Sequence, residues 1–361
     1  MSVRPSWKRP VTESIGASED MTSELLSDLD EAAGGFRWWN GQVTDTRTRA
    51  DIADYLVSVS RAVGKLLERL AYIRDEHGKT AYAQDHWFRE RLAESRRSGL
   101  GGPPKLSDKR DEDITRDVKE DTLSTAFYVS AASLMDNLAT LTIGVLGLSH
   151  NILTGDARFL ELTKTGDRAY PPETGSKLAK SLLRSDSGGG RTQRDALRAV
   201  RTSVHQAGPT DWWPWVDDMR NVQAHQGKRT EFKLFPKTPK TVLDYLATLS
   251  PRQPRMTDTQ NLQLDSLEEA WILEDSRELM SHILGSVNAA TAGSLIALQS
   301  VWRARRDAPN LIGQPLVQWP PGRPPLRFEG YQRNVLELPA GSSIFVGPES
   351  ARRLRASKSL D

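Results

Sequence analysis

The sequence predicts an all-α protein built from long helices. Three segments repeat apolar residues at steps of three and four, the spacing of one face of an amphipathic helix. They lie between Ile52 and Ile73, between Glu120 and Leu148, and between Asp265 and Arg306. With 361 residues the chain is long enough for one large helical body with a substantial core.

The first long helix contains a sustained apolar stripe. Its members are Ile52, Leu56, Val59, Val63, Leu66, Leu70 and Ile73. His77 and Gly78 follow the stripe, and glycine is common just past a helix end, so we expect a C-cap here. A separate short helix is predicted for residues 79–97.

The second long helix is the most apolar stretch of the chain. Ala126–Leu148 resembles a membrane span, but Asp136 and Asn137 lie near its centre. Because an aspartate at the middle of a bilayer costs about 2.5–3.5 kcal/mol, we expect a buried helix of a soluble bundle and no membrane partner. The N-terminus lacks the apolar stretch of a signal peptide, which predicts a cytoplasmic protein.

The third long helix is expected to begin at Asp265, because Glu268 completes the spacing of a capping box. If it continues to Arg306 it is about 60 Å long and offers a surface to a partner. Shorter helices are predicted for residues 174–185, 191–206 and 213–226, and a short strand for 230–235. Gly-rich segments at 99–104 and 185–190 are interpreted as connectors.

We divide the chain into three parts. Residues 1–45 form a polar N-terminal arm, irregular to residue 18 and with a short helix over 19–33. Residues 46–306 form the helical domain. Residues 307–361 form a basic, Pro-rich tail, in which 335–338 and 344–346 predict a small β-hairpin.

Charge is distributed unevenly although the net charge is only +2. Residues 303–361 carry ten basic and five acidic side chains, and residues 1–10 carry three basic ones. The remaining 292 residues therefore carry a net −6. Basic ends are compatible with RNA, with an acidic partner or with solvated tails. The absence of cysteine excludes disulfides and thiolate chemistry.

The segment Arg220–His225 carries the strongest chemical signal. An imidazole transfers protons near neutral pH, and a guanidinium stabilises the charge that develops on a phosphoryl group. On an ideal α-helix, however, residues five apart lie about 140° around the axis, so these two would not share a face. For both to reach one phosphate, the helix must be distorted, the arginine must reach round, or two chains must combine their segments.

Arg220-Asn221 followed by Ala224-His225 resembles the Arg, polar residue, variable residues, His signature of the HEPN superfamily. The match covers six residues. The resemblance implies an all-α bundle and a metal-independent endoribonuclease without a cofactor, active as a homodimer. It also implies a role in toxin–antitoxin pairs or in antiviral (anti-phage) defence, with an antitoxin or defence protein as partner. Some members of the superfamily are not nucleases.

Carried onto this chain, the resemblance makes Arg220 the residue that binds and stabilises the phosphate. His225 becomes the general acid/base, and Asn221 orients it or contacts the RNA substrate. The implied reaction is attack of the 2′-OH on the adjacent phosphate, giving a cyclic phosphate. An acidic residue on an earlier helix accompanies such motifs, and Asp136 is the best match. Asp136 belongs to a polar line with Ser133, Asn137 and Thr140, and buried polar groups need partners.

Structural alternatives stay open for each of these residues. Asn221 and His225 can cap a helix that ends at Gly227, and Asp136 can be satisfied without a catalytic role. Trp212, Trp213 and Trp215 can stack on bases or pack in the core. Asp217 and Asp218 can bind magnesium or complement a helix dipole. The alternative function is a non-catalytic helical interaction or scaffold protein that oligomerises through its long C-terminal helix.

Overall fold

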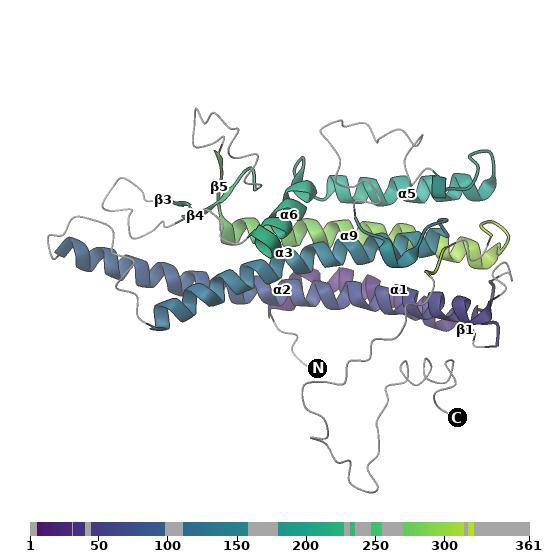
Figure 1. Ribbon diagram of the computed structural model, residues 1–361, viewed down its shortest axis with the longest axis horizontal. Coiled ribbons are helices and arrows are strands. Elements are labelled where there is room, and N and C mark those ends of the chain that lie inside the picture. Colours follow the sequence, from purple (N-terminus) through teal and green to yellow (C-terminus); the bar gives the residue numbers. More distant parts are fainter. Residues whose placement is uncertain are drawn as a thin grey trace, which may run out of the picture.

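The predicted all-α fold is confirmed. A computed structural model describes residues 6–30, 32–39, 45–97, 111–157, 180–226, 232–234, 247–254, 270–313 and 317–320. Six α-helices dominate these residues; five run lengthwise in an elongated bundle, and the short α6 lies obliquely against it (Figure 1). They are α1 (Thr12–Asp28), α2 (Thr46–Arg97), α3 (Asp111–Leu146), α5 (Gly188–Gln206), α6 (Trp212–Asn221) and α9 (Ser276–Asp307). Two 3₁₀ turns, η1 (Ser6–Val11) and η3 (Ile152–Thr154), and a π-helical turn, η4 (Val222–Gln226), complete the helical elements.

Two small antiparallel sheets accompany the bundle. The strands β1 (Leu29–Asp30) and β2 (Gly35–Phe36) form a pair after α1. A three-stranded sheet has the order β3 (Phe232–Leu234), β4 (Ala247–Pro251), β5 (Trp271–Asp275). The strand predicted over 230–235 is therefore present as β3, whereas the sequence analysis did not find β4 and β5.

The prediction of a helix end at His77-Gly78 is wrong, because α2 is one helix of 52 residues. A glycine inside a helix costs only about 1 kcal/mol relative to alanine. Packing against α3 on both sides of this position offsets that cost: His77 is 3% exposed, and Thr80 and Ala81 are buried. The pieces predicted for 52–73 and 79–97 are parts of the same element.

The predicted start of the C-terminal helix is also wrong. Residues 271–275 are the edge strand β5, and α9 begins at Ser276. The N-cap is Asp275, whose carboxylate accepts a hydrogen bond from the Arg277 N–H at 2.9 Å. The 32 residues of α9 span about 48 Å, shorter than the predicted 60 Å.

The N-terminal segment is more ordered than predicted. Residues 6–11 form η1, and α1 begins at Thr12 and ends at Asp28, so the helix starts earlier than residue 19. Its inner face lies in the core, where Met21 and Leu25 are fully buried, as is Val11 at the end of η1. The described part of the predicted arm thus packs with α2 and α9.

The glycines of the predicted connector at 185–190 belong to the first turn of α5. The Ser187 side chain caps this turn by accepting from the Gly190 N–H at 2.9 Å. A Cβ on Gly189 would lie 2.1 Å from the Leu311 carbonyl oxygen, and one on Gly190 would lie 1.9 Å from that of Arg184. The glycines are therefore explained by close backbone packing. The segment 99–104, residues 174–179 of the helix predicted for 174–185, and the tail hairpin lie outside the described residues, and residues 182–185 are not helical.

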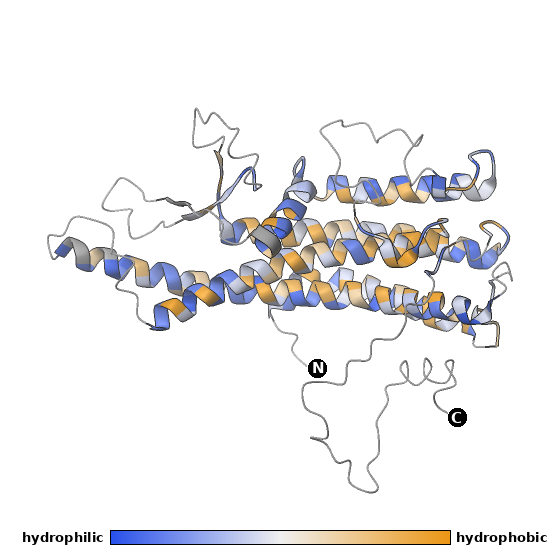
Figure 2. Cartoon of the chain, viewed as in Figure 1, coloured by the Kyte–Doolittle hydropathy of each residue, from blue (hydrophilic) through white to orange (hydrophobic). Residues whose placement is uncertain are grey.

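The core runs along the bundle where α2, α3 and α9 lie together, and hydrophobic residues gather there (Figure 2). The helix α3 is long and apolar enough to span a membrane, but 78% of its most apolar window is buried inside the protein. Its contact with α2 is close at Gly144, where a Cβ would lie 2.1 Å from Leu56 Cδ2. These features are those of a core helix.

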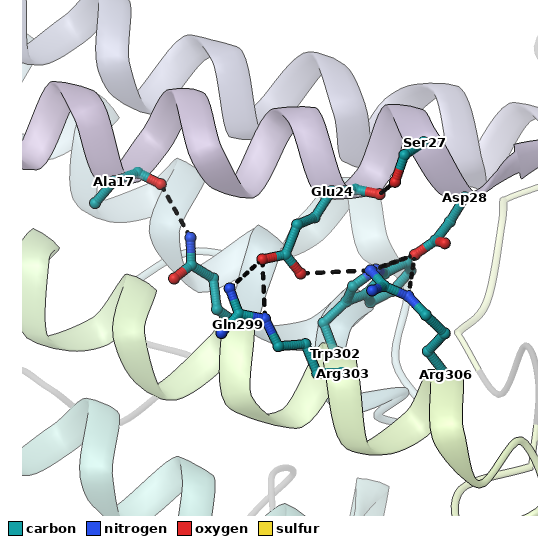
Figure 3. A network of polar contacts seen from close by, with 8 residues as sticks. All are labelled: Ala17, Glu24, Ser27, Asp28, Gln299, Trp302, Arg303 and Arg306. Carbon is teal, nitrogen blue, oxygen red and sulfur yellow. Dashed lines mark hydrogen bonds and ion pairs between the residues drawn. The ribbon is translucent and has the colours of Figure 1, made fainter.

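A polar clamp joins α1 to α9 (Figure 3). Asp28 Oδ2 accepts hydrogen bonds from Trp302 Nε1 at 2.9 Å and from Arg306 Nε at 2.8 Å. Glu24 accepts from Arg303 and from Arg306. Asp28 is 8% exposed, so its carboxylate depends on these donors.

A buried arginine joins α9 to the end of α3. Arg305 is 0% exposed, and its Nη1 donates to the carbonyl oxygens of Gly144 and Val145. Its guanidinium lies 5.3 Å from the ring centroid of Trp38 and 5.7 Å from that of Trp302. Burial lowers the pKa of Arg305, but an arginine keeps its charge at neutral pH. The cation complements the negative end of the α3 dipole.

Candidate functional site

The helix that carries the motif, α6, is anchored by its tryptophans. Trp212 Nε1 donates to the Val204 carbonyl at 2.9 Å, and Trp215 Nε1 donates to the Pro251 carbonyl at 3.0 Å. Trp213 is 2% exposed and belongs to the core. The tryptophans therefore pack inside the protein, and this packing holds α6 against α3, α5 and the β4 strand.

Asp217, Arg220 and Asn221 form one polar cluster in the last turn of α6. Arg220 Nη2 forms an ion pair with Asp217 Oδ1, and Asn221 Nδ2 donates to Asp217 Oδ2 at 3.4 Å. Residues three and four apart lie on one helix face, which explains why one carboxylate reaches both side chains. Asp217 is 6% exposed, while 24% of the Arg220 side chain is exposed.

Asp136 lies on α3, which packs against both α6 and η4. Its Oδ1 accepts a hydrogen bond from the Ala157 N–H at 3.0 Å. Burial raises the pKa of the Asp136 carboxyl, and the Ala157 N–H and the Arg220 charge act in the opposite direction. The charges of Asp156 and Asp217 add to the rise. The fold thus brings Asp136 into the electrostatic field of Arg220.

Two other members of the polar line on α3, Asn137 and Thr140, donate to main-chain oxygens. Asn137 Nδ2 donates to the Ser133 carbonyl at 2.6 Å, and Thr140 Oγ1 donates to the Gly155 carbonyl at 3.1 Å. These contacts are local to α3 and the turn that follows it. Within this line, Asp136 is the residue whose charge interacts with the motif.

The helix changes from α to π geometry immediately after the Arg220-Asn221 pair. The π-helical turn η4 comprises Val222–Gln226 and includes the backbone of His225. The hydrogen bonds of a π-helix join residues five apart, so the turn reduces the angle between positions 220 and 225 relative to an ideal α-helix. Single π turns inside helices occur frequently at functional sites. The side chain of His225 lies outside the described residues.

Several polar atoms of the segment lack a hydrogen-bond partner among the described residues. They are Arg220 Nε and both amide atoms of Gln223, all of them buried. Gln223 lies between Arg220 and His225 in sequence, and the sequence analysis did not single it out. A native protein leaves few buried polar groups unsatisfied, and those that remain concentrate at sites of strain or function.

Arg220 interacts with two carboxylates of the described residues. It pairs directly with Asp217, and its charge acts on the pKa of Asp136. Among the residues that the structure describes, no group of three or more His, Asp or Glu side chains has the geometry to hold a metal ion.

A small cavity lies away from this cluster, between α2, α3, β4 and α9. Its volume is about 20 Å³, and His77, Glu120, Ser124 and Tyr128 belong to its lining. This is room for about one water molecule. The cavity therefore does not hold a nucleotide, and the motif segment stays the candidate site.

Comparisons of the chain with protein-family models, with characterised proteins and with solved structures found no match. The class defined by the fold and the cluster is a helical bundle with an arginine–carboxylate site at an α-to-π transition.

Proposed function

We propose that the chain is a metal-independent endoribonuclease of HEPN type that acts through Arg220 and His225. The observation that carries the proposal is the π-helical turn, which begins after Asn221 and contains His225. A regular helix would place positions 220 and 225 on different faces, and the π geometry of the backbone lessens the angle between these two positions. The partly exposed Arg220 at the same place supports the proposal.

In the proposed reaction the 2′-OH of RNA attacks the adjacent phosphorus. The O2′–P bond forms, the P–O5′ bond breaks, and the products are a cyclic phosphate and a free 5′-OH. His225 transfers a proton at one of the two oxygens, and Arg220 stabilises the charge on the phosphoryl oxygens. Asn221 contacts the substrate, and Asp136 supports the orientation of the cluster. A second copy of the chain in a homodimer supplies the other proton-transfer group.

The test is cleavage of RNA by purified protein in the presence of EDTA. We expect Arg220→Ala and His225→Ala each to lower cleavage by about 10²-fold or more, because each removes one catalytic contribution. His205→Ala is the matched control, since His205 is exposed near the end of α5. Unchanged cleavage in both motif variants, or dependence on a divalent metal, would contradict the proposal.

The biological setting follows from the resemblance alone. We propose a cytoplasmic toxin or an anti-phage defence ribonuclease, held inactive by a partner protein. Expression of the native chain is expected to arrest growth, and His225→Ala is expected to abolish the arrest. Growth arrest by both the native protein and His225→Ala would contradict a catalytic cause of the arrest.

One observation favours the alternative of a non-catalytic interaction protein. The outer face of α9 presents Gly285 and Ala289 to solvent, and Ile296 is 65% exposed. A small-residue face with an exposed isoleucine suits contact with another helix. Under this alternative, Ile296→Glu abolishes self-association, and neither the native protein nor any variant cleaves RNA above the level of a reaction without protein.

A further inference from the structure

We propose that Asp217 is the residue that positions both polar side chains of the motif, Arg220 and Asn221, for catalysis. The inference rests on the ribonuclease function proposed above and adds a residue to its site. The resemblance assigns no role to Asp217. The structure places its two carboxylate oxygens on two different partners, Arg220 Nη2 and Asn221 Nδ2.

Burial makes this carboxylate a rigid support. Asp217 is 6% exposed, and the tryptophans of the preceding turn fix α6 against its neighbours. A charge-assisted hydrogen bond in a partly buried position is stronger than one in water. The long side chain of Arg220 therefore loses its freedom before substrate arrives, and this ordering lowers the entropy that the reaction must overcome.

The position of Asp217 also relates to the change in helix geometry. Its contacts span residues 217–221, the last α-helical turn, and the π turn starts at Val222. The carboxylate thus holds the end of the regular helix on which Arg220 and Asn221 lie. Loosening of this turn would alter the placement of the following π turn and of His225.

Asp217 does not occupy all the donors of Arg220. A guanidinium has five N–H donors, and the ion pair with Asp217 involves Nη2. The side chain remains 24% exposed. The carboxylate can therefore orient the arginine while N–H groups of its exposed part remain available to a phosphate. If Asp217 acted mainly by neutralising Arg220, its removal would raise cleavage.

The experiment compares Asp217→Asn with Asp218→Asn on the RNA that the native protein cleaves. Both changes remove one negative charge from α6, but only the first removes the contact with Arg220. We expect kcat to fall by about 10–100-fold in Asp217→Asn and to change less than about threefold in Asp218→Asn. Circular dichroism and the thermal midpoint report whether each variant is folded, and Asp217→Glu serves as a second variant with the charge kept.

A double variant separates positioning from a general structural effect. In an Arg220→Lys background the guanidinium is absent, so Asp217→Asn is expected to cost at most a few-fold in kcat. Equal losses in both backgrounds, or unchanged or higher kcat in the single variant, would overturn the inference while leaving the ribonuclease proposal intact. A native protein that cleaves no RNA would overturn both.

Discussion

Asp136 is a half-buried carboxyl group whose protonation is coupled to folding. Because burial raises the pKa of Asp136, the folded protein holds this proton more tightly than the unfolded chain does. As the pH rises, the Asp136 carboxyl therefore loses its proton at a lower pH in the unfolded chain than in the folded protein. The contribution of Asp136 to the free energy of unfolding is therefore greatest below the ordinary aspartate pKa, and it declines from there through the raised pKa of the folded state.

We predict that Asp136→Asn raises the urea midpoint at pH 7 and leaves it nearly unchanged at pH 3. The asparagine keeps an acceptor for the Ala157 N–H and removes the cost of a buried charge. Asp121→Asn is the control, because Asp121 is exposed on the same helix and its replacement is expected to shift the midpoint little at either pH. A lower midpoint for Asp136→Asn at pH 7 would mean that attraction to Arg220 outweighs burial.

The resemblance led us to expect Asp136 close to the motif, whereas the residues alone indicated only that an aspartate on an apolar helix needs a partner. Whether Arg220 and His225 share a substrate stays a prediction. The contacts of Asp217 with Arg220 and Asn221 could have been predicted from the sequence, because residues three and four apart meet on one face of a helix. Gln223 carried no such signal, because only tertiary packing decides that both its amide atoms are buried.

At the scale of elements, the clamp between α1 and α9 combines buried and exposed charges. The Asp28 carboxylate is buried and accepts from Trp302 and Arg306, whereas 58% of the Arg303 side chain is exposed. Removal of one partner from a buried hydrogen-bonded charge leaves the others unsatisfied.

We predict that Asp28→Ala lowers the free energy of unfolding by about 3 kcal/mol, while Arg303→Ala, on an exposed side chain, lowers it much less. Urea unfolding followed by circular dichroism measures both values. Equal effects of the two changes would show that burial of Asp28 contributes little to the attachment of α1.

The long helices were predictable because their apolar stripes are continuous over many turns. Their ends were less predictable. Gly78 has the appearance of a C-cap, yet a Cβ there would meet no described atom within 4 Å, and the helix continues because α3 packs alongside. Residues 271–275 fit a helical pattern as well as a strand, and pairing with β4 decides between them. In both cases the deciding contact is with a segment distant in the sequence, so the local residue pattern does not reveal it.

At the scale of the whole molecule, net charge and helix packing bear on different properties. The body of the chain is acidic, so the RNA binding that we propose requires local cations near the motif. The segments that carry Lys228, Arg229, Lys237 and Lys240 lie outside the described residues. Helix packing, in contrast, is shared along the bundle, and α9 contacts α1, α2, α3 and α5.

The length of α2 has a practical consequence for any measurement of subunit number. Its 52 residues span about 78 Å, whereas a compact chain of 361 residues would have a radius of gyration of only about 21 Å. Such a rod-like particle experiences more friction than a sphere of equal mass. We predict that a single 40.2 kDa chain elutes from a gel-filtration column earlier than a compact protein of that mass, near the position expected for a dimer. Light scattering, which reports mass independently of hydrodynamic drag, distinguishes the two; elution at the position of a 40 kDa sphere would contradict the extended shape.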